Sequence, residues 1–263
     1  MTLILIATAA LGLAVGSFLN VVVHRVPLAL SVASPASRCP ECHHPIRHRH
    51  ILPVLGWLLL RGRCADCAAP ISARYPAVEL LTAALFVGVT ARLVQLGLPT
   101  AIPAFLWFVA VGIVLALIDL DVRRLPDLIT LPAYPVLAVL LSLAAVLAGE
   151  PESLLRASVG ATASYAFYYA LALVKPGAMG FGDVKAAGLV GGMLAFVSYP
   201  VLLVGTLAAF MLGASVGVAA MVARRAERTT AVPFGPFMVA GALLAVFLGA
   251  PLAETYHRLL MSV

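Results

Sequence analysis

The 263-residue sequence contains very little charge. Charged residues make up 11% of it and hydrophobic residues 63%, whereas an ordinary soluble domain carries about 25% charged residues. The mean hydropathy is +1.08. This composition excludes a soluble globular protein. It predicts a polytopic membrane protein that contacts the lipid bilayer along most of its length and confines its polar chemistry to a few places.

Other features are also absent. No small-residue cleavage site of the A-x-A type follows the first apolar run, so we expect that run to remain as a membrane span. No glycine-rich nucleotide loop, internal repeat or low-complexity linker is evident. The net charge of +6 is explained by basic cytoplasmic loops, and we therefore expect no nucleic-acid partner.

Eight apolar runs are candidates to cross a bilayer as helices. The sixth is short, and its glycines, Gly188, Gly191 and Gly192, would permit close helix packing. We expect an all-α membrane protein with about eight transmembrane helices: a first helix (1–23), a cytoplasmic domain (24–76) and a transmembrane core (77–263). The runs cover residues 3–23, 77–96, 101–119, 128–148, 154–174, 185–199, 201–222 and 236–253.

The distribution of arginine and lysine predicts the orientation. If the N-terminus lies outside, only Arg92, Arg156 and Arg258 of the 17 basic residues fall on the outer side. Because basic loops remain in the cytoplasm, we expect both termini outside and the first loop inside. Beyond the first loop, the inner side would hold Arg123, Arg124, Lys175, Lys185, Arg224, Arg225 and Arg228.

The four cysteines form two C-x-x-C pairs in the first loop. Cys39 and Cys42 are separated by 21 residues from Cys64 and Cys67, a spacing that suits a tetrahedral Cys₄ zinc site. The loop has too few apolar residues for a core, so zinc would supply much of its folding free energy. The alternative is four free thiols in a reducing cytosol. Since four sulfur atoms would complete the site, we expect four nearby histidines at the surface: His43, His44, His48 and His50.

Two of the 11 acidic residues stand out. Asp119 ends the third apolar run, and Asp183 lies in Gly180-Phe-Gly-Asp-Val-Lys185. A carboxylate at membrane depth costs about 2.5–3.5 kcal/mol on insertion scales, so it is a functional candidate. Two such carboxylates that meet can act as general base toward water and general acid toward an amide. The alternative is that the Gly–Asp segment is only a loop and helix cap, a role we also expect for Asp127 on the fourth helix.

Several motifs occur in order along almost the whole chain. Gly180-x-Gly182-Asp183-x-Lys185 resembles the GxGD signature of intramembrane aspartyl proteases. The stretch 119–127 resembles the first-aspartate motif of type IV prepilin peptidases, and residues 16–27, the cysteine pairs, Arg74-Tyr-Pro-Ala-Val-Glu79 and Pro233-Phe-Gly-Pro-Phe237 also fit. The resemblance implies cleavage of prepilin or pseudopilin leaders at the cytoplasmic face of the bacterial inner membrane, with Asp119 and Asp183 as the catalytic pair.

For members with the cysteine-bearing loop, the resemblance also implies N-methylation of the new N-terminus with S-adenosylmethionine. This chain departs from many members in that loop: segment 28–38 is short, and His50-Ile-Leu-Pro53 and Gly56-Trp57 replace Asn-Ile-Pro and Ser-Trp. A peptidase without methyltransferase activity therefore stays open. The alternative from another class is a transporter or channel whose aspartates bind an ion. The oligomeric state is not predicted.

Other residues are candidates for supporting roles. Gly180 and Gly182 would let the backbone approach a neighbouring segment closely. Lys185 could act on Asp183, bind substrate or anchor its helix at the interface, and we favour a supporting role. Asn20, Arg25 and Glu79 are candidates for substrate or methyl-donor contacts. For Asn20 and Arg25 the alternative is that they only lie at the membrane–water interface. For Glu79 it is that the carboxylate pairs with a basic loop residue such as Arg74.

Overall fold

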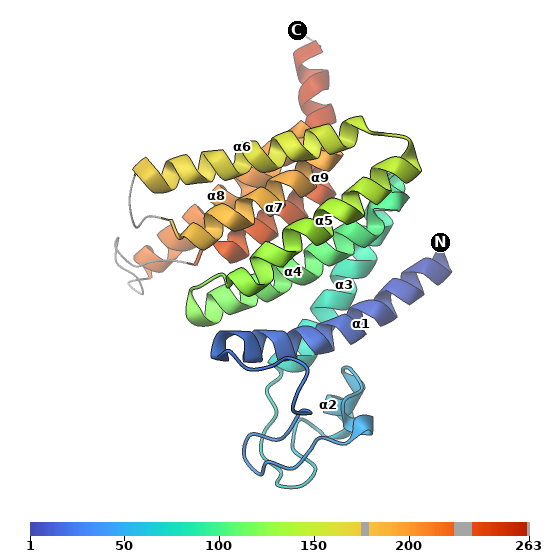
Figure 1. Cartoon of the computed structure of the whole chain (residues 1–263), viewed down its shortest axis with the longest axis vertical. Coiled ribbons are helices and arrows are strands. Elements are labelled where there is room, and N and C mark those ends of the chain that lie inside the picture. The colour runs from blue at the N-terminus through green and yellow to red at the C-terminus, as the bar shows by residue number, and fades with distance from the viewer. Residues whose placement is uncertain (175–178, 224–232, 262–263) are drawn as a thin grey trace. The chain divides into compact units, whose positions relative to one another are not determined.

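The computed structural model describes residues 1–174, 179–223 and 233–261. In these residues every regular element is a helix, which confirms the all-α prediction (Figure 1). The short elements are α2 (Leu55–Leu59), η1 (Val26–Leu28), η2 (His48–His50) and η3 (Pro99–Ala101). The long helices are α1 (Thr2–Arg25), α3 (Arg74–Gln95), α4 (Ile102–Val122), α5 (Asp127–Ala148), α6 (Glu152–Val174), α7 (Phe181–Val197), α8 (Tyr199–Val222) and α9 (Gly235–Met261).

Each predicted apolar run corresponds to one long helix, but not every helix is a clear membrane span. Among the described residues, 6 helices are long and apolar enough to cross a membrane: α1, α3, α4, α5, α6 and α8. Helix α7 has 17 residues, fewer than a typical spanning helix needs. The protein is therefore a multi-pass membrane protein, and the count of about eight spans stays a prediction.

The orientation also stays a prediction. Two of the outer arginines hold helix carbonyl groups: Arg92 donates to the Val246 carbonyl (3.2 Å) and Arg156 to the Phe196 carbonyl (3.2 Å). The predicted orientation also rests on four basic residues that lie outside the described residues: Lys175, Arg224, Arg225 and Arg228. The side chain of Arg258 is not described either.

The chain forms two compact units, Met1–Ala91 and Arg92–Val263, which we call the N-terminal and C-terminal units. In the N-terminal unit, α1 and α3 approach each other at Gly12 and Gly16. A Cβ at Gly12 would lie 2.6 Å from the Ala83 Cα, and one at Gly16 would lie 2.7 Å from the Glu79 Cα. This G-x-x-x-G spacing is a known signal of close helix packing in membranes. The predicted division at 23/24 and 76/77 stays a prediction.

In the C-terminal unit, α7 contacts α5, α6, α8 and α9 and lies among them in Figure 1. Small residues make this possible, as expected for the sixth run. A Cβ at Gly191 would clash with Ser164 of α6, and one at Gly188 would clash with the Tyr134 hydroxyl of α5. From Val184 onward most of α7 is therefore enclosed by protein, whereas its first turn is partly exposed, with Phe181 51% exposed.

Candidate active site and metal centre

Asp119 lies in the last turn of α4, and only 5% of its surface is exposed. Its Oδ2 atom accepts a hydrogen bond from the Gly235 N–H (3.0 Å) at the start of α9. A Cβ at position 235 would lie 2.9 Å from that oxygen, so only glycine brings its N–H this close without a shift. Helix α4 ends shortly afterwards at Arg123, whose φ of 53° is left-handed.

Asp183 lies in the first turn of α7. Its Oδ2 atom accepts from the Gly180 N–H (3.2 Å) and so caps this helix. The capping role foreseen as the alternative to catalysis is therefore present, but a carboxylate can accept several hydrogen bonds and keeps capacity for another role. The close approach expected of Gly182 is also present, since a Cβ there would lie 2.8 Å from the Leu125 Cβ.

The two aspartates come together in the C-terminal unit. Leu125 lies against both Gly182, which precedes Asp183, and Gly235, whose N–H binds Asp119, although 64 positions separate the two aspartates in the chain. The C-terminal end of α4 and the N-terminal ends of α5, α7 and α9 gather at one end of this unit (Figure 1). Each carboxylate is oriented through Oδ2 by one glycine N–H. Such a pair can divide the roles of general base and general acid.

Lys185 forms an ion pair beside this site. Its Nζ atom donates to both oxygens of Asp127 at 2.7 and 2.8 Å and lies 5.1 Å from the centre of the Phe181 ring. The expectation that Asp127 caps the fourth helix is wrong: its side chain makes no cap hydrogen bond, and Pro126 occupies the cap position. The carboxylate instead joins α5 to α7 through Lys185.

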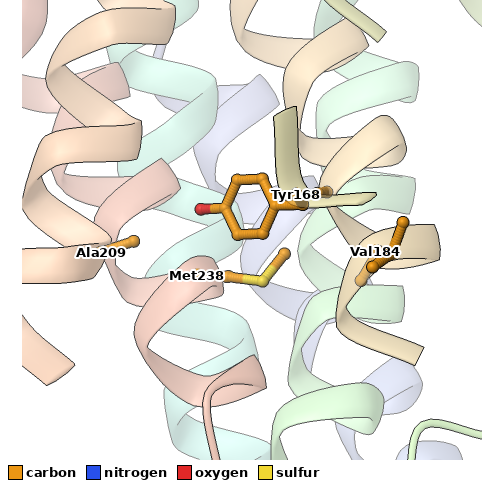
Figure 2. Close-up of a cluster of buried hydrophobic side chains, with 6 residues drawn as sticks. Tyr168, Val184, Ala209 and Met238 are labelled. Carbon is orange, nitrogen blue, oxygen red and sulfur yellow. The ribbon is translucent and has the colours of Figure 1, made fainter. Parts of the chain in front are cut away.

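A cluster of buried hydrophobic side chains around Tyr168 packs against Val184 in the first turn of α7. Figure 2 shows the Tyr168 side chain between Val184 of α7 and Ala209 of α8, with Met238 of α9 beside it. The Tyr168 ring lies 6.1 Å from that of Phe234, which directly precedes Gly235. Packing around Tyr168 therefore helps to fix the start of α9, and with it the Gly235 N–H that donates a hydrogen bond to Asp119.

The four cysteines gather in one cluster in the N-terminal unit. Their Sγ atoms all lie within 4.8 Å of one another, with Cys39 to Cys67 at 3.8 Å and Cys42 to Cys64 at 4.0 Å. A tetrahedral site with Zn–S bonds of about 2.3 Å has sulfur–sulfur edges of about 3.8 Å. The donor set and its spacing therefore fit a metal ion.

The two cysteine pairs form an internal repeat, which corrects the expectation that none exists. Residues 38–46 read Arg-Cys-Pro-Glu-Cys-His-His-Pro-Ile and residues 63–71 read Arg-Cys-Ala-Asp-Cys-Ala-Ala-Pro-Ile. The backbone repeats as well: antiparallel bridges join Arg38 to Pro45 and Arg63 to Pro70. His43 and Ala68 occupy matching positions with φ of 59° and 60°.

The histidines near the cysteines do not join the cluster, as far as the structure describes them. His43 and His44 are exposed and His50 is half-buried, and the only described group that could hold a metal consists of the four cysteines. The surface placement expected for His43 and His44 is therefore confirmed. The side chain of His48 lies outside the described residues.

The three candidates for substrate or methyl-donor contacts hold backbone groups. Asn20 donates to the Tyr75 carbonyl (3.1 Å) and Arg25 to the Ser31 carbonyl (2.9 Å). Glu79, only 7% exposed, accepts from the Val54 N–H (2.6 Å). The Asn20 bond joins α1 to α3, and the bonds of Arg25 and Glu79 tie the cysteine-bearing loop to the ends of these two helices. These are structural roles, and no described contact tests a catalytic one.

Sequence reasoning missed several residues of the site region. Gly235 was noted only as part of a motif, and its hydrogen bond to Asp119 spans 116 positions. Leu125, Tyr134 and Tyr168 carry no sequence signal of their own, because their importance depends on which helices become neighbours. The ion pair of Lys185 could have been suspected from the scarcity of acidic partners, but Asp127 had another plausible role.

Comparisons with known proteins agree with this geometry. A family model described as the Bacterial Peptidase A24 N-terminal domain matches residues 10–93, and one for the type IV leader peptidase family matches residues 105–218. The second range contains Asp119 and Asp183 but ends before Gly235. No solved structure matches the chain.

Curated relatives match nearly the whole chain, and the three described here are each named prepilin leader peptidase/N-methyltransferase. A protein of Aeromonas hydrophila is 35% identical over 271 residues, 93% of this chain and 91% of that protein. One of Pseudomonas putida is 36% identical over 274 residues, 95% and 92% of the two chains. One of Bacillus subtilis strain 168 is 30% identical over 248 residues, 94% and 96%. With its paired aspartates, its cysteine cluster and these full-length relatives, the chain belongs to the type IV leader peptidase family.

Proposed function

We propose that this protein cleaves the leader peptide of type IV prepilins or type II secretion pseudopilins at the cytoplasmic face of the bacterial inner membrane. The observation that carries the proposal is the placement of Asp119 and Asp183 at one end of the C-terminal unit, each oriented by a glycine N–H, among apolar helices. A buried carboxylate, Asp119, and a half-buried one, Asp183, among apolar helices are costly to maintain without a function. The names of the relatives support the substrate class.

The chemistry assigned to the pair is hydrolysis of a peptide bond. One carboxylate, as general base, takes a proton from a water molecule whose oxygen attacks the scissile carbonyl carbon. The other, as general acid, gives a proton to the leaving amide nitrogen, so the C–N bond breaks and a new N-terminus forms. The N–H groups of Gly180 and Gly235 hold one oxygen of each carboxylate in place during these transfers.

The cysteine cluster is assigned to zinc. The four Sγ atoms fit a tetrahedral ion, and four sulfur ligands leave no open position for catalysis, so the ion is structural. Cys39, Cys42, Cys64 and Cys67 would hold it and close the loop between α1 and α3.

We also propose that the new N-terminus is methylated, with S-adenosylmethionine supplying the methyl group. This part rests on the names of the relatives and on the match of residues 10–93. Because Asn20, Arg25 and Glu79 are already bonded to backbone groups, we assign none of them a contact with the methyl donor.

One experiment tests both reactions. The purified protein in lipid vesicles is incubated with a prepilin peptide and S-adenosylmethionine, and the products are weighed by mass spectrometry. Loss of the leader mass and gain of one methyl group are expected. Cleavage without the gain of a methyl group would mean that the protein is a peptidase without methyltransferase activity. Ion flux into the same vesicles with no cleavage would favour a transporter and overturn the proposal.

A further inference from the structure

The short helix α2 carries an uncovered apolar face. Leu55, Leu58 and Leu59 are 57%, 56% and 72% exposed. They lie on one side of the helix, at positions i, i+3 and i+4. On the other side Gly56 is buried, and Trp57 donates its Nε1–H to the Ile71 carbonyl (3.0 Å). The leucines therefore face outward because the opposite face holds the loop together.

Helix α2 is held at a defined level along α3. Val54, which precedes α2, donates its N–H to Glu79 (2.6 Å), five residues after Arg74 begins α3. At about 1.5 Å per residue this contact lies about 7 Å along α3. Helix α3 has 22 residues, which span about 33 Å, close to the ~30 Å hydrocarbon core of a bilayer. Helix α2 therefore lies level with one end of a membrane-crossing helix.

Apolar and basic neighbours extend this surface. Leu80 and Leu81 of α3, next to Glu79, are 53% and 48% exposed. Exposed arginines flank α2 in the chain at Arg49, Arg61 and Arg63. Exposed leucines beside arginines at the end of a spanning helix are typical of segments that lie in the membrane interface. The basic residues complement the phosphates of anionic lipids.

We infer that α2 is an interfacial element whose leucines enter the boundary between lipid headgroups and acyl chains, with the flanking arginines contacting anionic phosphates. Two observations favour a lipid surface as the partner of these leucines. Glu79, which holds α2, lies near one end of α3, and exposed arginines flank α2 in the chain. This contact does not depend on the proposed peptidase activity. It attaches the cysteine-bearing loop to the membrane at α2, in addition to the connections to α1 and α3.

The test places a fluorescent reporter on the exposed face. The sequence contains 2 tryptophans, so Trp107→Phe leaves Trp57 as the sole native reporter. Leu59→Trp is added to that variant, and the difference between the two proteins isolates position 59. Both are reconstituted in vesicles of phosphatidylcholine and phosphatidylglycerol with bromine at shallow or deep acyl positions. We expect the added fluorescence to be quenched by shallow bromines more than by deep ones, and weakly by aqueous iodide.

The matched control is Ala65→Trp in the same background, on an exposed position of the second cysteine pair. It is expected to show the stronger iodide quenching of a reporter in water. Position 59 behaving like position 65 would overturn the inference. A blue-shifted signal at position 59 that neither quencher reaches would mean that a protein surface covers the leucines, and would also overturn it. Leu58→Trp repeats the measurement on the same face should the first variant fail to fold.

Discussion

Asp119 and Asp183 are each oriented by a single N–H group that a glycine supplies. Their Oδ2 atoms accept from Gly235 and Gly180 at 3.0 and 3.2 Å. Substitution can therefore separate the two roles of each aspartate side chain: its position, which the glycine N–H fixes, and its transfer of a proton. An amide keeps an oxygen that accepts the glycine N–H but cannot exchange the proton that catalysis needs.

We expect Asp119→Asn and Asp183→Asn each to lower the rate of leader cleavage by about 10²–10⁴-fold, the usual contribution of general acid–base groups. The glycine hydrogen bonds should persist, so the variants should still fold and insert. The measurement is cleavage of a prepilin peptide in vesicles. Glu150→Gln makes the same kind of change at an exposed acid and should leave the rate unchanged. Normal cleavage by either aspartate variant would remove it from the catalytic pair.

Gly235→Ala should disturb Asp119 without removing any functional group. The new Cβ would lie 2.9 Å from the Asp119 Oδ2, so the carboxylate or the start of α9 must shift. Because displacement of about 1 Å can cost about 10²-fold in rate, we expect a fall of about that size. The matched control is Gly217→Ala in α8, where a Cβ meets nothing within 4 Å. Equal cleavage by both alanine variants would show that this contact does not position Asp119.

At the scale of elements, Lys185 connects the first turns of α5 and α7. Its ion pair with Asp127 is bidentate, and the Lys185 carbonyl accepts from the Tyr134 hydroxyl (2.5 Å). Helix α5 follows Asp119 through the short link at 123–126, and α7 carries Asp183 two residues before Lys185. Because it joins α5 to α7, the ion pair helps to set the distance between the two aspartates.

Lys185→Gln or Asp127→Asn should lower kcat for cleavage by about 10-fold with a smaller effect on KM, since geometry rather than binding is altered. The exchange of both charges, Asp127→Lys with Lys185→Asp, should restore part of the loss. Kinetics of Asp127→Lys, of Lys185→Asp and of the double variant that combines them measure this coupling. Additive losses in the double variant would mean that the two side chains act independently.

Zinc should be required by the cysteine-bearing loop. We expect the purified protein to contain zinc, and Cys64→Ser to lose it and to expose the loop to protease, because a metal site of this kind supplies folding free energy. Elemental analysis and limited proteolysis measure the two effects. His43→Ala changes an exposed neighbour outside the cluster and should retain the metal. Protein that lacks zinc but keeps a protease-resistant loop would contradict the assignment.

At the scale of the whole molecule, the aspartate pair and the cysteine cluster belong to different compact units. The aspartates lie within Arg92–Val263 and the cluster within Met1–Ala91, and the proposal of methylation rests on the match of residues 10–93. We therefore expect Cys64→Ser to lower methylation more than cleavage. Mass spectrometry of the processed peptide reads both yields in one sample. A loss of cleavage as large as the loss of methylation would show that the peptidase also depends on the metal.

Much of the fold is predictable from the sequence because the bilayer fixes the length of an apolar run, so each of the eight long helices in the described residues corresponds to an expected run. Asp119 and Asp183 are predictable because charge is scarce at membrane depth. The partners of these residues are not. Gly235 and Asp127 act through contacts with segments more than fifty positions away, and no local pattern encodes such contacts. The Arg-Cys-x-x-Cys repeat, by contrast, is a local pattern that the sequence alone shows.

The repeated cysteine pairs have a mechanical consequence for α2. Helix α2 lies between Cys42 and Cys64, so a bound ion acts as a cross-link that closes a loop around it. Its N-terminal side is separately tethered by Glu79 through Val54. Loss of the ion would open the loop but leave that tether. The helix would then keep its attachment to α3 at Val54 and its lipid contact, while the cysteine pairs on either side of it are no longer joined.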